Sequence, residues 1–483
     1  MDLVPLIGDW SSGPGPLYSR LAQAMQSAIE SGELTAGSRL PPERPLAEAL
    51  AVSRTTVVLA YKGLRERGLV ESRQGSGTWV PRRAAVTRPL PRDETSRSFL
   101  VESLTRAASD APPDTIAFMG ACLPGTGLAL DEEWRAAEAE VAEIACGTGY
   151  SPQGWPALRL KVAAHFEARG VPTTPDEILV TNGAQQAIDL VGRLLVGRGE
   201  AVVLEDPTYL GAIDAFTLAG ARLLPVPVGR DGADIAALKR TTQQTTPALI
   251  YLVPSFHNPT GCLMPEGARR EVAALVETSG IALVEDESLA DLSFGAEPPP
   301  PIAAFAPRAA VFTVGSLSKL FWGGLRVGWL RGPRALVARL TRLKVAADLS
   351  GSQLSQLLAT RLLARRDEVA RMRRRESRRR FERLTGLLRA ELPDWSWSEP
   401  AGGLTLWVRL PAPAAVELAR VAPRHGVSIV PGPVHSPSHG FADRLRLPYV
   451  MDDAKLTEGI ARLARAWQEC QKPTRERRLD VIV

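Results

Sequence analysis

From about residue 113 to residue 470, short β-branched apolar runs alternate with longer amphipathic segments. The apolar runs are EILVTNG, AVVLEDP, ALIYLVP, IALVEDE and AVFTVGS, and PEGARREVAALVETSG is one of the amphipathic segments between them. Strands that alternate with helices are typical of a largely parallel sheet covered by helices. We therefore predict an α/β domain over residues 113–470 with a mostly parallel central sheet.

The rest of the chain has a different organisation. Residues 14–80 contain short periodic segments, and residues 81–112 are rich in proline and arginine with little apolar periodicity, which is typical of a linker. No apolar stretch is long enough for a membrane helix, and the first residues lack the basic region of a signal peptide. The four cysteines show no C-x-x-C spacing, so we expect neither disulfides nor a metal site. A cytoplasmic protein without membrane contact is expected.

Three helices are predicted before residue 70. The first has apolar residues at spacings of three and four: Leu17, Leu21, Met25, Ala28 and Ile29. The second begins among prolines 41, 42 and 45 and has Leu46 and Leu50 on its apolar face. The third follows Ser53, a favourable N-cap residue, and its inward face is predicted to hold Val57, Ala60, Tyr61 and Leu64.

The third helix has the features of a helix that contacts DNA bases. Arg54, Thr55 and Thr56 lie at its N-terminal end and Lys62 along one side, and recognition helices contact base edges mainly with N-terminal residues. Residues 52–83 hold seven basic and two acidic residues, although the whole chain carries only +5. A hairpin is predicted around residues 74–77, where a small glycine tip beside Arg73 can approach phosphates.

The stretch LPPERPLAEALAVSRTTVVLAYKGLRERGLVESRQGSGTWV resembles the winged helix-turn-helix of GntR-type bacterial regulators. The resemblance implies binding to double-stranded operator DNA. The DNA contacts that the resemblance implies are Arg44, Arg54, Thr55, Thr56, Gln74 and Gly75. We add Ser53, Lys62 and Arg73, which lie beside them in the sequence, to the candidate DNA-binding residues. The alternative is a three-helix protein-interaction module whose arginines are only solvated.

The segment GSLSKLFWGGLRVGW, residues 315–329, carries most of the predicted chemistry. Lys319 follows a Ser-x-Ser pair at a predicted strand end, and Arg326 comes seven residues later. A lysine can form a Schiff base with an aldehyde cofactor, while Ser316, Ser318 and Arg326 can hold the phosphate of that cofactor. This pattern indicates pyridoxal 5′-phosphate.

Upstream motifs supply the other groups that such a cofactor needs. Asp286 ends the run IALVEDE and can keep a pyridine nitrogen protonated, and Asn258 in NPTG offers an amide to the phenolic oxygen. TNGAQQAI offers backbone N–H groups at a helix start, and Tyr209 can stack on the ring. Each motif alone is weak, because S-x-S-K occurs by chance and an aspartate at a strand end is often a turn residue. Their order and separation together are specific.

The whole of residues 113–470 resembles the fold type I aminotransferases, which implies a smaller C-terminal α+β subdomain beside the central sheet. By this resemblance, Ala184 and Gln185 join the phosphate site, and Tyr150, in YSPQGWPALR, reaches the phosphate of the partner subunit. Arg446 in DRLRLPY would bind an effector or substrate α-carboxylate, with Arg444 as the near alternative.

A winged helix followed by an aminotransferase-like domain is the arrangement of the MocR subfamily of GntR regulators. The resemblance implies a head-to-tail homodimer that binds pyridoxal phosphate and changes its operator binding in response to an amino compound or the cofactor itself. The chain departs from the family at Ser288, because the family usually has a tyrosine at this position that supports the ring oxygen of the cofactor. Alternatives are a working aminotransferase with an accessory DNA-binding domain, and a scaffold with little cofactor function.

Two further features have competing interpretations. Residues 365–383 hold ten arginines and four acids, and we expect the solvated face of a long helix with Val369, Met372 and Phe381 inward, rather than a second nucleic-acid surface. His435 and His439 are four residues apart, but Pro437 argues against a metal-binding helix. We expect them in a loop that borders the cofactor site.

Overall fold

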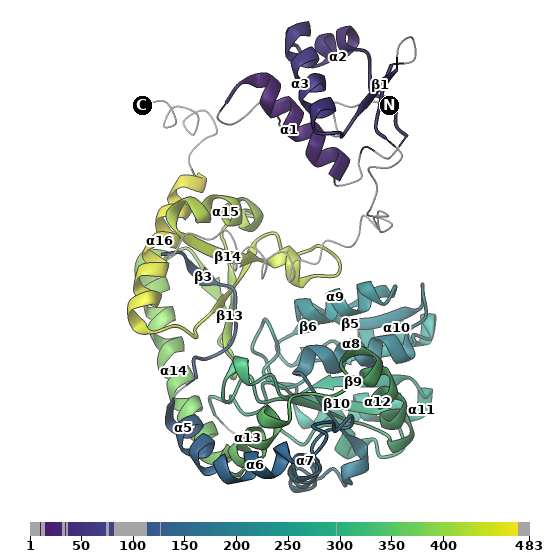
Figure 1. Cartoon of the computed structure of the whole chain (residues 1–483). Coiled ribbons are helices and arrows are strands. Elements are labelled where there is room, and N and C mark those ends of the chain that lie inside the picture. Colours follow the sequence, from purple (N-terminus) through teal and green to yellow (C-terminus); the bar gives the residue numbers. More distant parts are fainter. Residues whose placement is uncertain are drawn as a thin grey trace. The chain divides into compact units, whose positions relative to one another are not determined.

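The computed structural model of the chain describes residues 10, 15–30, 34, 37–73, 77–81, 114–125, 127–295 and 297–471. The chain divides into two compact units, Met1–Thr95 and Ser96–Val483 (Figure 1). The tip residues Gln74 and Gly75 and residues 82–112 of the predicted linker 81–112 lie outside the described residues. No helix in the described part of the chain is long and apolar enough to cross a membrane.

The first unit is a three-helix bundle with a small hairpin. Its elements are α1 (Leu17–Glu30), α2 (Glu43–Ala49), α3 (Arg54–Glu66), β1 (Glu71–Arg73) and β2 (Gly77–Trp79). The predicted inward residues of α3 are buried, and they pack with Leu21 and Met25 of α1 into one apolar cluster. As predicted, Ser53 is the N-cap of α3, because its hydroxyl accepts a 3.1 Å hydrogen bond from the Thr56 N–H.

The hairpin of this unit is antiparallel, with Ser72 paired to Thr78. Arg39 forms a bridge to Trp79 on the outer side of β2, so the short segment before α2 extends the hairpin. This arrangement is a winged helix, in which the wing and α3 belong to one folded body.

The second unit is built on an eight-stranded sheet with the order β4-β11-β10-β9-β8-β5-β6-β7. The five inner strands β10, β9, β8, β5 and β6 are parallel, while β11 and β7 are antiparallel to their neighbours. The strand bounds are β4 (Ile178–Thr181), β5 (Ala201–Asp206), β6 (Arg222–Gly229), β7 (Gly232–Ala233), β8 (Leu249–Leu252), β9 (Ala282–Asp286), β10 (Val311–Ser316) and β11 (Gly328–Arg331). All five apolar runs noted in the sequence are strands, so the mostly parallel sheet is confirmed.

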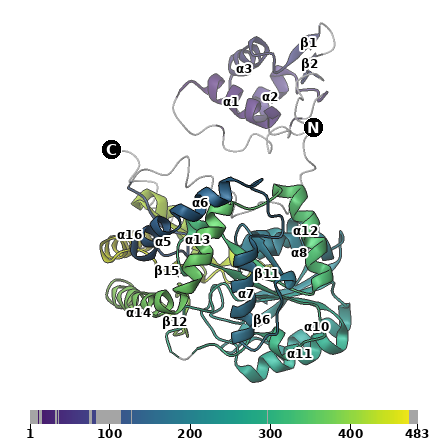
Figure 2. The same cartoon turned by 60° about the horizontal axis from the view of Figure 1, so that its bottom comes forward.

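Helices cover both faces of this sheet (Figures 1 and 2). Alternate strand residues pack against different helix layers, as Ile250 does on one face and Tyr251 on the other. The first face is covered by α7 (Pro156–Ala168), α10 (Ile235–Thr245), α11 (Glu266–Ser279) and α13 (Gln353–Ala364). The second face is covered by α8 (Ala184–Leu195), α9 (Leu210–Leu218) and α12 (Arg334–Asp348). Short elements complete the large subdomain: α5 (Gly127–Ala136), α6 (Glu138–Ala145), η1 (Pro175–Glu177), η2 (Ile302–Phe305) and η3 (Gly323–Leu325).

The predicted smaller subdomain is confirmed as a five-stranded sheet with the order β12-β13-β15-β14-β3. Its bounds are β3 (Ile116–Phe118), β12 (Ser396–Trp397), β13 (Thr405–Arg409), β14 (Val427–Pro431) and β15 (Arg444–Pro448). One face packs on α14 (Arg366–Glu391) and α16 (Asp453–Gln471), with α15 (Ala415–Val421), η4 (Ala422–His425) and η5 (Gly432–His435) nearby. Its edge strand β3 comes from the start of the unit and runs parallel to β14.

The arginine-rich run forms the predicted long helix α14, with Val369 and Phe381 buried and Met372 partly buried. The prediction that its arginines are solvated is wrong for two of them, since Arg373 is 1% and Arg380 7% exposed. The Arg373 guanidinium is tolerated inside because it donates to three carbonyl oxygens and pairs with a carboxylate: Leu320, Phe321, Pro124 and Glu376. A charge pattern alone does not reveal such internal acceptors.

Candidate functional site

The candidate site lies at the carboxyl ends of the parallel strands, where β9 ends at Asp286 and β10 at Ser316. Asp286 lies two residues after Val284 on β9, so the two side chains point to the same face of the sheet. This is the face that α8, α9 and α12 cover. Lys319 follows three residues after β10 and is close enough to Asp286 for its ammonium group to favour the carboxylate. The strand order therefore brings together two residues that lie 33 positions apart.

Asp286 is held by hydrogen bonds from two directions. The Tyr251 hydroxyl donates to Oδ2 at 3.0 Å, and the Ser288 N–H donates to Oδ1 at 2.9 Å. Burial nevertheless raises the pKa of Asp286, while these hydrogen bonds and the Lys319 charge act in the opposite direction. A carboxylate in this state gains from a cationic partner such as a protonated pyridine nitrogen.

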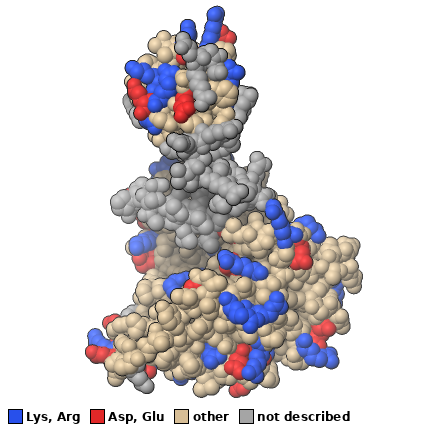
Figure 3. Space-filling view, turned by 45° about the vertical axis from the view of Figure 1, so that its right-hand side comes forward, with Lys and Arg blue, Asp and Glu red and all other residues tan. Residues whose placement is uncertain are grey.

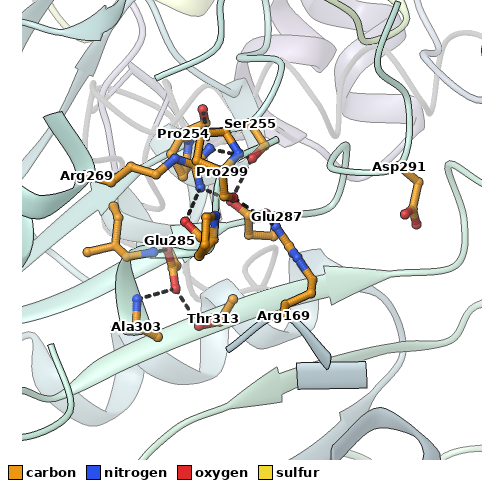
Figure 4. A network of polar contacts seen from close by, with 12 residues as sticks. Arg169, Pro254, Ser255, Arg269, Glu285, Glu287, Asp291, Pro299, Ala303 and Thr313 are labelled. Carbon is orange, nitrogen blue, oxygen red and sulfur yellow. Dashed lines mark hydrogen bonds and ion pairs between the residues drawn. The ribbon is translucent and has the colours of Figure 1, made fainter. Parts of the chain in front are cut away.

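Glu285, the last residue but one of β9, and Glu287, which follows the strand, take part in a polar network (Figure 4). Both point to the face of the sheet opposite to Asp286. Glu285 accepts hydrogen bonds from the Thr313 hydroxyl at 2.6 Å and from the Ile302 and Ala303 N–H groups. Glu287 accepts from Arg169, Arg269 and Ser255 at 2.9, 3.1 and 2.8 Å. Burial opposes ionisation of Glu287, but the two guanidinium groups lower its pKa overall. This network fixes the end of β9 and thereby the position of Asp286.

The amino group of Lys319 is directed toward the segment before α5. Its Nζ donates to the Ala121 carbonyl oxygen at 2.9 Å and lies 3.5 Å from Cys122 Sγ. Lys319 is only partly buried, so its nitrogen is accessible to a small molecule.

The N-terminus of α8 offers groups that could hold an anion. Gly183 has φ +96°, and a Cβ added there would lie 3.0 Å from Arg326 Nη2, so the guanidinium lies directly over this glycine. Arg326 donates to the Asn182 carbonyl oxygen, and the free N–H groups of Ala184 and Gln185 begin the helix. Backbone N–H groups at a helix start together with a guanidinium suit a phosphate dianion.

Several buried polar atoms of the predicted site residues have no hydrogen-bond partner among the described residues. They are Asn258 Oδ1, Ser318 Oγ, Gln185 Oε1 and Arg446 Nε. Such unsatisfied atoms are costly in a protein interior unless a ligand completes them. Tyr209 lies among the same groups, since Asp286, Arg446, Cys122 and Arg326 all act on its pKa, which burial raises. The residues therefore fit a ligand with a phosphate, an aromatic ring, a phenolic oxygen and an aldehyde.

Arg446 approaches this site from the small sheet. It is 3% exposed, it donates to the Met119 carbonyl oxygen, and burial lowers its pKa to about 10. Burial and, to a smaller extent, the charge of Arg446 lower the pKa of His435, whose Nδ1 lies 3.1 Å from the Thr208 carbonyl oxygen. A buried cation without a carboxylate partner is favourably placed for an anionic ligand.

Tyr150 and Ser288, both singled out in the sequence, lie in different surroundings. Tyr150 is 62% exposed, and its N–H donates to the Thr148 hydroxyl at 3.5 Å. Ser288 lies beside Asp286, where its N–H donates to the carboxylate and its hydroxyl also lowers the pKa of that group.

In the winged-helix unit, the side chains of Arg44, Ser53, Arg54, Thr55 and Lys62 are exposed, and that of Thr56 is partly buried. Arg54 forms a 3.2 Å ion pair with Glu43, Arg44 lies 3.4 Å from Glu48, and Lys62 lies 3.9 Å from Glu66. Basic and acidic side chains accordingly lie side by side on this unit (Figure 3). Such exposed pairs are weak, so phosphates can compete for the cations.

Three residues near these sites were not predicted from the sequence. Tyr251 lies within the apolar run ALIYLVP and Cys122 in a segment without a motif. Arg39 is exposed, and its guanidinium lies 5.5 Å from the centre of the Trp79 ring, beside the wing. The one signal for Tyr251 in the sequence was its hydroxyl group, which needs a hydrogen-bond partner when the side chain is buried on a central strand.

Known proteins share both units. A model of bacterial regulatory proteins of the gntR family matches residues 17–80, and a model of aminotransferase class I and II matches residues 119–463. The probable rhizopine catabolism regulatory protein MocR of Rhizobium meliloti is 31% identical over 86% of each chain. The 2-aminoadipate transaminase of Thermus thermophilus is 36% identical over 73% of this chain and 90% of its own. The crystal structure of an α-aminoadipate aminotransferase from Thermus thermophilus, complexed with N-(5′-phosphopyridoxyl)-L-leucine, has a TM-score of 0.70 and 33% identity, covering 78% of this chain and 96% of its own.

The fold and the site thus define a DNA-binding winged helix joined to an aminotransferase-like domain, whose cofactor is pyridoxal 5′-phosphate. The chain belongs to the MocR subfamily of GntR-type regulators, and its large unit belongs to the aminotransferase class I and II family.

Proposed function

We propose that the protein is a transcriptional regulator whose large unit uses pyridoxal phosphate to sense an amino compound, or the cofactor itself, and thereby changes its binding to operator DNA. When bound, the cofactor supplies an aldehyde that condenses with amines and a ring that accepts electrons. The cytoplasm is the compartment consistent with a DNA partner.

In this proposal, each residue around Lys319 has one task. Lys319 holds the cofactor covalently, and Asp286 keeps the ring nitrogen protonated. Asn258 donates to the phenolic oxygen and Tyr209 stacks on the ring. The phosphate is held by Ala184, Gln185, Ser316, Ser318 and Arg326.

The observation that carries the sensing function is the buried Arg446. Its guanidinium is almost completely removed from water, has an unpartnered Nε, and acts electrostatically on Tyr209 in the cofactor site. A planar guanidinium binds a carboxylate through two parallel hydrogen bonds, so Arg446 is suited to the α-carboxylate of an amino acid. Such a ligand would present its amino group to the cofactor.

The exposed Tyr150 supports a head-to-tail homodimer. Its side chain is 62% exposed in its own chain, which is the situation expected of a side chain that binds the phosphate in the partner subunit. Changing Tyr150 to Phe should then weaken cofactor binding without changing the fold of the isolated subunit. Analytical ultracentrifugation together with cofactor dialysis checks both parts.

For the DNA, we propose that α3 enters the major groove. Arg54, Thr55 and Thr56 would contact base edges, with Ser53 fixing the start of the helix and Arg44 and Lys62 contacting phosphates. Arg73 and the predicted tip residues Gln74 and Gly75 would contact the adjacent backbone.

The test is DNA binding by the full-length protein in the presence and absence of cofactor and amino acids. Fluorescence anisotropy with its own upstream DNA should show an affinity change when a binding amino acid is added to the cofactor-loaded protein. Lys319→Ala should abolish this change while leaving DNA binding itself intact. An affinity that does not depend on any added amino acid or on the cofactor would contradict the sensing function.

The second candidate is a working aminotransferase with an accessory DNA-binding unit. It is favoured by the 36% identity to a 2-aminoadipate transaminase and by the presence of both Lys319 and Arg446. Sustained turnover of an amino acid with a 2-oxo acid, of the order of 1–10³ per second, would support the enzyme. A change in the absorption spectrum without turnover would support the regulator.

A further inference from the structure

Strand β15 presents two arginines on the face turned toward the cofactor site. Arg444 and Arg446 are two residues apart on β15, so their side chains project from the same face, while Leu445 and Leu447 pack into the core on the other. A contact from the neighbouring strand β13 shows which part of the molecule this face is turned toward. Thr405, on the same face of β13, donates to the Pro259 carbonyl oxygen at 3.2 Å, beside Asn258.

The two arginines lie in different surroundings. Arg446 is almost fully buried, whereas the side chain of Arg444 is 26% exposed and lines an open cavity of about 770 Å³. The cavity lies between the two subdomains, and its wall includes Pro207, Thr260, Trp407 and Phe441. A volume of this size accommodates a small organic ligand.

The residues that line the cavity adjoin residues of the cofactor site. Trp407 is paired with Arg446 across β13 and β15, and its ring lies 5.9 Å from that of His435, which contacts the Thr208 carbonyl oxygen. Pro207 and Thr260 lie two residues from Tyr209 and Asn258, respectively. A ligand bound to Arg446 can therefore extend its side chain along this wall toward Arg444.

The charge of Arg444 is available to such a side chain. Its neighbour Asp443 is engaged by Arg409, with Nε and Oδ2 3.0 Å apart, whereas Arg444 Nε lies 3.9 Å from Asp443 Oδ1. The other charged residues of the cavity are Arg230, Asp231 and Glu399. All three are exposed, and Glu399 lies 3.6 Å from Arg378 outside the cavity wall. Arg444 is thus the half-buried cation of this cavity.

We propose that the amino compound is a dicarboxylic amino acid, whose α-carboxylate binds Arg446 and whose distal carboxylate binds Arg444. This inference rests on the proposed function. Alternate residues of a strand are about 7 Å apart, a distance that the carbon chain of an amino acid the length of glutamate spans together with the flexible guanidinium groups. Arg444 then determines specificity, and Arg446 provides the binding common to all α-amino acids.

The test uses the cofactor-loaded full-length protein and the nearly isosteric pair L-glutamate and L-glutamine, which differ in the distal charge. Isothermal titration calorimetry, with the absorption change as a second readout, should show glutamate binding at least about tenfold more tightly than glutamine. Arg444→Leu should reduce the affinity for glutamate to that for glutamine, and Arg444→Lys should restore part of the preference. Arg420→Leu, which removes an exposed arginine of α15, should retain the full preference.

Each other outcome has a definite meaning. Equal affinities in the wild-type protein would overturn the dicarboxylic ligand, and a preference that survives Arg444→Leu would overturn the assignment to Arg444. In both cases the sensing of amino acids would stand. A protein that binds neither amino acid nor any other amino compound, although its cofactor absorption depends on Lys319, would overturn the proposed function as well.

Discussion

The hydroxyl of Tyr251 on β8 donates a 3.0 Å hydrogen bond to Oδ2 of Asp286 on the adjacent strand β9. Both groups are buried, and the hydrogen bond joins the core of the sheet to the carboxylate that faces the cofactor. The phenol therefore acts on the cofactor through Asp286, as a positioning residue.

Changing Tyr251 to Phe should weaken cofactor binding several-fold and lower the free energy of unfolding by about 1–3 kcal/mol, because the buried carboxylate loses a donor. Equilibrium dialysis and thermal unfolding measure the two effects. Tyr449→Phe is the matched control, since Tyr449 is equally buried in the small subdomain, 3.4 Å from the Gly402 carbonyl oxygen. It should alter stability only. Equal cofactor affinity in both variants would exclude a positioning role for Tyr251.

Asp286→Asn should stabilise the cofactor-free protein at alkaline pH. Burial raises the pKa of Asp286, so this group contributes stability at low pH that is lost as the pH rises through its folded value. The neutral amide removes that loss. At pH 8 we therefore expect the free energy of unfolding to rise by roughly 1 kcal/mol, or the melting temperature by about 2 °C. This gain should disappear toward low pH. Cofactor affinity should fall at the same time. Asp367→Asn, at a 90% exposed side chain, should show neither effect, and a destabilised Asp286→Asn protein at pH 8 would argue against the raised pKa.

Arg373→Ala should destabilise the large unit by about 3–5 kcal/mol, because it leaves buried carbonyl oxygens and Glu376 without their donor. Two of those carbonyls belong to Leu320 and Phe321, directly after Lys319, so the cofactor content should fall as well. Arg375 is exposed on the same helix, and its change to Ala should stay within about 0.5 kcal/mol. Denaturant unfolding monitored by circular dichroism measures both, and similar values for the two variants would contradict the internal role of Arg373.

Two arginines of the winged helix should affect DNA binding differently. Arg54→Ala should cost about 1–3 kcal/mol and relax specificity at one base pair, because Arg54 begins the recognition helix. Arg39→Ala, beside the wing, should weaken binding to all sequences alike and reduce the salt dependence by about one phosphate contact. Anisotropy titrations at several salt concentrations with matched and altered sites separate these results. An Arg39→Ala protein with an unchanged salt slope would remove Arg39 from the interface.

Local patterns in the sequence predicted the elements whose formation depends on neighbouring residues. The N-cap at Ser53 and the strand that ends at Asp286 follow from short-range preferences and periodicity. Lys319 and Asp286 were assigned to one site from the chemistry of their motifs and from the resemblance to fold type I aminotransferases.

Features that depend on distant packing were not predictable in this way. The burial of Arg373 depends on carbonyl oxygens of residues about 50 and 250 positions away, and the charge of an arginine by itself favours solvent. The hydroxyl of Tyr251 indicates that it needs a hydrogen-bond partner, but nothing in the neighbouring residues identifies Asp286 as that partner. The cavity beside Arg444 arises only where the two subdomains meet.

The edge strand β3 connects the strand of Arg446 to the beginning of the described part of the second unit. Ile116–Phe118 are hydrogen-bonded to β14, which is bonded in turn to β15, the strand that carries Arg446. Under the proposed function, a ligand that displaces Arg446 would displace β3 as well, because the backbone hydrogen bonds of the small sheet join the three strands.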